Sequence, residues 1–225
     1  MNRSFEEDLD KLRSRLIRMG SLVEEQVEFS FRALKEGNLE LARIVTERDE
    51  KVNKLDLKID KQCQRIFALN QPVAVDLRLL LTAIKINNEL ELIGDIATEI
   101  AQAVIDTPAV TELSRTIDIE PLTNAVYTMV KSSMDAFITN DPELALHILP
   151  SDDTVDALYL QKRATLIDIM TSDQATVAAG AELLLSLQDM EHMADHASNI
   201  AENVIFLVRA QLVRHQSFEG ETGTA

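Results

Sequence analysis

The residues of this chain best suited to chemistry are two pairs of carboxylates, the second of which repeats the first 100 residues later. Glu91 and Asp95 stand in Glu-Leu-Ile-Gly-Asp, and Glu191 and Asp195 stand in Glu-His-Met-Ala-Asp. In a helix, positions i and i+4 share a face, so each pair projects two like charges side by side. Two carboxylates placed in this way repel each other unless solvent or a cation separates them. Each pair is therefore a candidate cation site.

A second repeated motif supplies further carboxylates. Asp49, followed by Asn53, is matched at an offset of 103 by Asp152, followed by Asp156. If the helices that carry these motifs pack together, four carboxylates converge in the second half and three in the first. An all-oxygen ligand set favours hard cations such as Mg²⁺, Ca²⁺, Mn²⁺ or iron. We therefore expect a divalent or trivalent cation (Mg, Mn or Fe), held more weakly in the first half because Asn53 replaces a carboxylate. The predicted metal ligands are Glu91, Asp95, Glu191, Asp195, Asp49, Asp152 and Asp156. The alternative is that these are solvated faces of charged helices.

The histidines are weaker candidates for metal ligands than the carboxylates. His192 and His196 each lie one position beyond a motif carboxylate, about 100° around a helix, so we expect them at the surface or at the edge of a groove. Asp189-x-x-His192 only loosely matches the Glu-x-x-His motif of di-iron carboxylate bundles, which need two such motifs. A di-iron oxidase is therefore the enzymatic alternative. The sequence has no Ser-His-Asp order, glycine-rich phosphate loop or Cys-x-x-Cys, and no catalytic residue is predicted.

Long helices must position these motifs. Only 6 Gly and 5 Pro interrupt the chain, and apolar residues recur at three- and four-residue spacings between them. The expected segments are 4–35 (capped by Ser4), 39–69, roughly 35 residues between Pro72 and Pro108, 122–138, 142–170 with an interruption at Pro150, and 173–215. Three helices, a loop at 107–120 and three more helices predict an all-α fold, a tandem repeat of two three-helix bundles. The predicted domains are 1–110 and 111–215, followed by a disordered tail at 216–225.

Composition limits the partners and the compartment. The net charge of −16 argues against nucleic acid and anionic membranes as partners, although 16 of the 22 basic residues lie within residues 1–110. Cys63 is the single cysteine, so no intrachain disulfide can form and a reducing compartment is expected. Neither a signal peptide nor an apolar stretch long enough to span a membrane is recognisable, which predicts a cytoplasmic protein without direct membrane insertion.

The sequence resembles the PhoU family of phosphate-uptake regulators in four motifs that follow one another in the family's order. These motifs are residues 49–53, 71–78, 89–95 and 189–201. The resemblance covers nearly the whole chain, although the arginine usual in the family's Glu-Arg-Ile-Gly-Asp is missing from both copies. It implies two three-helix bundles in tandem, which form a cytosolic adaptor and often a homodimer.

The resemblance also implies a role. Such adaptors link a phosphate ABC transporter, through its ATPase subunit, to a membrane sensor histidine kinase. They hold the phosphate-starvation response off when phosphate is plentiful. Some members bind metal ions through motifs that correspond here to Glu91 and Asp95 and to Glu191 and Asp195. A metal-independent helical scaffold and a related protein that serves another transporter are the non-enzymatic alternatives.

Overall fold

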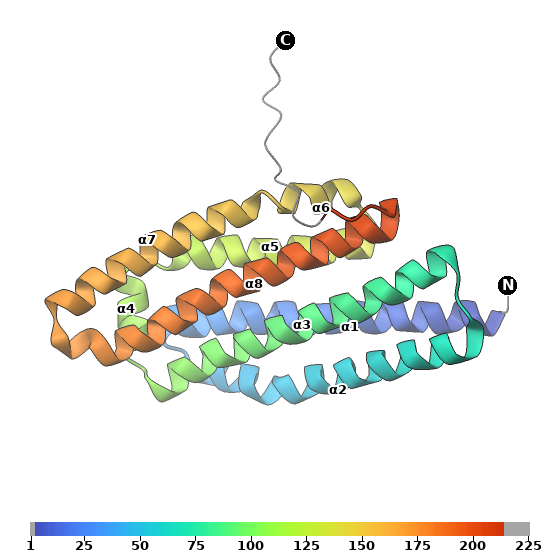
Figure 1. Cartoon of the computed structure of the whole chain (residues 1–225). Helices are drawn as coiled ribbons and strands as arrows, with labels where there is room; N and C mark the ends of the chain where they lie inside the picture. Colours follow the sequence, from blue (N-terminus) through green and yellow to red (C-terminus); the bar gives the residue numbers. More distant parts are fainter. Residues whose placement is uncertain (1–2, 214–225) are drawn as a thin grey trace, which may run out of the picture.

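The computed structural model describes residues 3–213 and confirms the predicted all-α fold. Three long helices form the first bundle, each packed against the other two (Figure 1). They are α1 (Arg3–Glu36), α2 (Leu39–Asn70) and α3 (Ala74–Asp106). Within the described residues no strand is present. Buried apolar residues recur along these helices at three- and four-residue spacings, as the sequence pattern predicts.

The second bundle is built from shorter pieces around one long helix. α8 (Val177–Arg209) packs against α5 (Glu120–Thr139), α6 (Pro142–Ile148) and α7 (Ser151–Ser172). The expected interruption at Pro150 is confirmed, because α6 ends at Ile148 and α7 begins at Ser151. A 3₁₀ turn (Gln174–Thr176) joins α7 to α8.

Several expected boundaries are wrong. The segment 107–120, expected to be a loop, contains α4 (Val110–Thr116), whose buried residues pack on α1 and α8. α1 begins at Arg3, so Ser4 lies inside the helix and does not precede it as a cap. α8 ends at Arg209, before the expected 215, where Ala210 adopts φ +56° and closes the helix. The tail expected to be disordered, 216–225, lies outside the described residues.

The two bundles lie side by side along α3 and α8, which run antiparallel in the centre of Figure 1. α1 also contacts α5, and buried apolar residues of both bundles form one continuous cluster. The boundary predicted between residues 110 and 111 falls inside α4, and the division into domains stays a prediction. Because α3 and α8 pack along this seam and share buried apolar residues, packing determines the relative position of the two carboxylate motifs.

None of the helices in residues 3–213 combines the length and the apolar character that a membrane span requires. Cys63 is free and buried in α2, as expected of a small core residue, and burial raises the pKa of its thiol to about 12.

Candidate functional site

The first carboxylate cluster joins α2 to α3. Glu91 and Asp95 lie one turn apart on α3, and the charges of Asp49 and Asp56 of α2 act on both of them; these four residues are the first cluster. The pKa of Glu91 is raised, first by burial and then by neighbouring carboxylates, of which Asp95 is the strongest. The pKa of Asp95 is raised by burial, then by Asp49. The carboxylates of α2 and α3 therefore repel each other across this surface.

Hydrogen bonds relieve part of that repulsion. The amide of Asn53 donates to Asp49 Oδ2 at 2.8 Å, and the hydroxyl of Thr98 lies 3.5 Å from Asp49 Oδ1. Asn87, which is almost fully buried, donates to Asp56 Oδ1 at 2.6 Å. Sequence reasoning missed Asp56. Its position seven residues after Asp49, which is two turns along the same face of α2, is the signal that could have identified it.

The second carboxylate cluster joins α7 to α8 and contains all four residues predicted for it. Asp152 and Asp156 come from α7, and Glu191 and Asp195 come from α8. The pKa of Asp152 is raised to about 6, first by burial and then by the charges of Asp195 and Asp156. Burial followed by Asp195 raises the pKa of Glu191, and burial followed by Asp156 raises that of Asp195. Asp195 is exposed to solvent and Asp152 is partly buried, so burial raises the pKa of Asp195 less than it raises that of Asp152.

One contact is repeated in both clusters. Ser198 Oγ lies 3.4 Å from Asp152 Oδ1 and so takes the place that Thr98 has beside Asp49. Because 198 follows 98 by 100 residues and 152 follows 49 by 103, the repeat seen in the sequence extends to matching side-chain contacts. The two motifs of each half therefore lie together in the structure.

Within the described residues, Glu89 of α3 makes polar contacts with two side chains of α8 across the α3–α8 seam. Glu89 Oε2 lies 2.7 Å from His196 Nδ1 and accepts from the amide of Asn199 at 3.2 Å. A carboxylate only accepts, so Nδ1 of His196 carries the proton in this contact. The repeat places Asp189 where the first half has Glu89, and its neighbour across the seam is Glu99. The pKa of Asp189 is raised to about 6 by burial and then by Glu99, while His192 lowers it.

The histidines have separate places. His192 is exposed, with Nε2 3.5 Å from Glu191 Oε2, whereas His196 is partly buried in the seam. His192 thus agrees with the expected surface position, and His196 contributes to the packing of α3 against α8. Gly94, the small residue inside the first motif, lies against α1 and α2: a Cβ there would stand 3.4 Å from Val52 Cγ1 and 3.5 Å from Gln26 Oε1. These are ordinary van der Waals distances, so a methyl group such as that of Ala194 in the second motif would fit at this position.

The chemistry of both clusters fits a hard cation, because carboxylate oxygens are the donors that such cations prefer. The crowded carboxylates repel one another, and a bound cation would offset that repulsion. Their side chains are not arranged as a finished site, however. Within residues 3–213, no three Asp, Glu, His or Cys side chains are placed to hold one metal ion together. Asp156 and Asp195 of the second cluster are exposed to solvent.

Comparisons with known proteins agree with the architecture. A family model described as PhoU domain matches residues 16–104 and again residues 119–204. The chain is 37% identical over 223 residues to the phosphate-specific transport system accessory protein PhoU homolog of Pseudomonas putida, which covers 99% of this chain and 87% of that protein. It is 31% identical to the protein PhoU of Escherichia coli, over 94% of this chain and 88% of that protein.

Two solved structures share the fold. The crystal structure of PhoU from Pseudomonas aeruginosa superposes with a TM-score of 0.84 at 34% identity, over 92% of this chain and 100% of that one. The phosphate transport system regulatory protein PhoU from Streptococcus pneumoniae gives a TM-score of 0.82 at 25% identity, over 93% and 99% of the two chains. The names of these relatives describe accessory and regulatory proteins, which agrees with the prediction that the chain is not an enzyme.

Proposed function

Because this chain belongs to the PhoU family, we propose that it is an accessory protein of a phosphate transport system and regulates uptake without catalysing a reaction. The observation that carries this proposal is the match of both halves to the PhoU domain, together with near full-length similarity to proteins named for that role. We further propose which partners the protein contacts and which cations it binds.

As an adaptor, the protein would link the ATPase subunit of the phosphate ABC transporter to a sensor histidine kinase, and it would keep the starvation response off. The two carboxylate clusters support this part. They concentrate negative charge on a broad helical surface, and complementary basic surfaces on partners would be steered to such a surface and would dock there. A homodimer, cytoplasmic location and the absence of membrane insertion belong to the same proposal.

The proposed role predicts the phenotype of a deletion. In cells that lack this chain, secreted phosphatase or another phosphate-starvation reporter is expected to stay on in phosphate-rich medium, because the signal that represses the kinase is missing. Expression of the wild-type chain should restore repression. Normal repression in the deletion strain would contradict the proposal and would favour a relative that serves another transporter or a plain scaffold.

Cations held by the clusters are the second part of the proposal. A bound divalent or trivalent ion (Mg, Mn or Fe) would neutralise the crowded carboxylates and alter the charge of the docking surface. Glu191 and Asp195, with Asp152 and Asp156, would hold the ion in the second cluster, and Glu91 and Asp95, with Asp49, would hold it more weakly in the first.

Neutral isosteres test the cation site directly. Glu191→Gln/Asp195→Asn is expected to weaken Mn²⁺ binding at the second cluster by at least about tenfold, since two of four oxygen-ligand carboxylates lose their charge. Isothermal titration calorimetry measures the affinity and stoichiometry. The matched control is Asp168→Asn/Glu182→Gln, which makes the same charge change at exposed positions outside the cluster. Equal Mn²⁺ affinity in both double variants and the wild type would refute the cation site and leave the adaptor role intact.

A further inference from the structure

A basic groove lies between α1 and α2, on a chain whose net charge is −16. The hollow has a volume of about 510 Å³. Its charged lining consists of Lys11 and Arg15 from α1, Lys58, Lys61 and Arg65 from α2, and the carboxylate of Asp8. Five cationic side chains and one carboxylate therefore line the groove. Its local charge is positive, whereas the net charge of the chain is negative.

Hydrogen bonds between α1 and α2 hold the floor of the groove in place. Arg15 donates to Gln62 Oε1 at 2.6 Å, and the amide of Gln62 donates to the backbone carbonyl of Asp8 at 2.7 Å. This chain of hydrogen bonds ties α1 to α2 and holds the partly buried guanidinium of Arg15 in place. In the described part of the chain, no salt bridge joins a carboxylate to any of the five cationic groups, whereas Lys54, outside the groove, pairs with Glu50. Within the described residues, no ion pair thus neutralises the positive charge of the groove.

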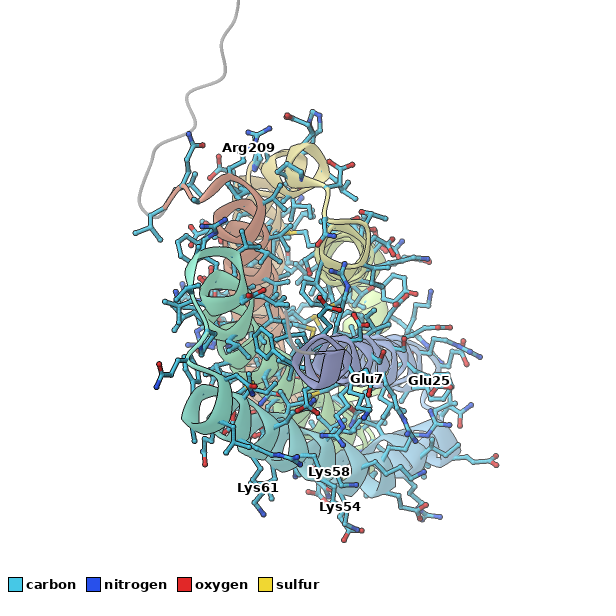
Figure 2. The ribbon with its side chains drawn as sticks, turned by 90° about the vertical axis from the view of Figure 1, so that its right-hand side faces the viewer. Glu7, Glu25, Lys54, Lys58, Lys61 and Arg209 are labelled. Carbon is cyan, nitrogen blue, oxygen red and sulfur yellow. The ribbon has the colours of Figure 1, made fainter. Side chains whose placement is uncertain are left out.

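The lysines belong to a stripe along one face of α2. Lys51, Lys54, Lys58, Lys61 and Arg65 recur at three- and four-residue spacings and are all exposed. Figure 2 shows Lys54, Lys58 and Lys61 projecting outward from α2 at one edge of the molecule.

The internal repeat shows that the fold does not require this charge. At the offset of 103 that aligns α2 with α7, the corresponding residues are Thr154, Ala157, Gln161, Ala164 and Asp168. Buried positions do match at this offset, because Val52 and Cys63 correspond to the buried Val155 and Leu166. The two bundles therefore share their core pattern, and only the first bundle carries the basic surface.

We propose that the groove between α1 and α2 binds a small polyanion with several phosphoryl groups, of the oligophosphate class. Five cationic groups converge around one hollow, so they suit a ligand that enters it and carries several negative charges in a small volume. Guanidinium donors match phosphate geometry, and lysines add mobile charge around them. The carboxylate clusters take no part in this contact.

Sodium tripolyphosphate, titrated calorimetrically into the full chain in the presence of EDTA, tests the proposal. One-to-one binding is expected, and sodium sulfate at equal ionic strength should give no comparable heat, because its charge is too small to engage both helices. The groove variant Lys58→Gln/Lys61→Gln is expected to bind at least about tenfold more weakly, since two charge-assisted contacts are lost.

The matched control is Lys51→Gln/Lys54→Gln, on the same stripe but outside the groove lining. It makes the same change in net charge, and glutamine keeps the helix propensity of lysine, so both variants should fold. The control should stay within about threefold of the wild-type affinity. Glu191→Gln/Asp195→Asn should bind tripolyphosphate as the wild type does, which separates this groove from the cation clusters. Equal weakening in the two lysine variants, or no saturable binding to the wild type, would overturn the proposal. Cosedimentation with phosphatidylglycerol vesicles without binding of tripolyphosphate would also overturn it and assign the groove to a membrane surface.

Discussion

Glu89→Ala is expected to lower the free energy of unfolding by about 2 kcal/mol, because it leaves two polar groups of the α3–α8 seam without their partner. Glu89 is only 14% exposed, and its carboxylate meets both His196 and Asn199 of α8. Urea unfolding at neutral pH, followed by circular dichroism, measures the loss. Glu89→Gln should lose less, since an amide oxygen can take the place of Oε2, the one oxygen that both His196 and Asn199 contact.

Asp189→Asn provides the matched control at the corresponding position of the repeat. Asp189 faces Glu99 across the same seam, so removal of its charge should stabilise the protein near pH 7.5 by on the order of 1 kcal/mol, after allowance for solvent screening. The two substitutions are thus expected to have opposite signs. Destabilisation of similar size by both would mean that the polar and charged contacts across the seam do not determine the sign of the effect.

The metal-free protein is expected to be more stable near pH 5 than near pH 7.5, by about 1.5 kcal/mol. The pKa values of Asp152 and Asp189 are raised to about 6 in the folded state, from an ordinary value of 3.8. The folded protein therefore binds protons more tightly than the unfolded chain. Stability falls as pH rises from about 4 through about 6, and it levels off above about pH 7, where both states are ionised.

Five further carboxyls shift in the same direction and should add to the effect. They are Asp56, Glu91, Asp95, Glu191 and Asp195. Urea unfolding at the two pH values, with EDTA present, measures the difference. Asp152→Asn/Asp189→Asn should remove most of it, because asparagine does not titrate. A wild-type stability that rises steadily from pH 5 to pH 7.5 would contradict the prediction.

Local rules predicted much of the fold. The caps at Asn38 and Asp141 each accept two backbone N–H groups at the start of α2 and α6, where the sequence places helix starts. Pro150 separates α6 from α7 because a proline cannot donate the hydrogen bond that a continuous helix needs. α4 was missed because its helix forms by packing on α1: Ser114 Oγ donates to the carbonyl of Leu34, and Arg115 reaches the carbonyls of Lys35 and Glu36. Such contacts leave no periodic pattern within seven residues.

The sequence by itself determined the repeat, the helix faces and the pairing of Glu91 with Asp95 and of Glu191 with Asp195, because an i, i+4 relation is fixed by the geometry of one helix. Only the tertiary structure decided which faces meet. It added Asp56 to the first cluster, paired Glu89 with His196 while setting Asp189 against Glu99, and closed a basic groove from α1 and α2. These contacts depend on the register between helices that are distant in the chain. That register follows from the shape of the packed core, to which every buried residue contributes, and no local spacing encodes it.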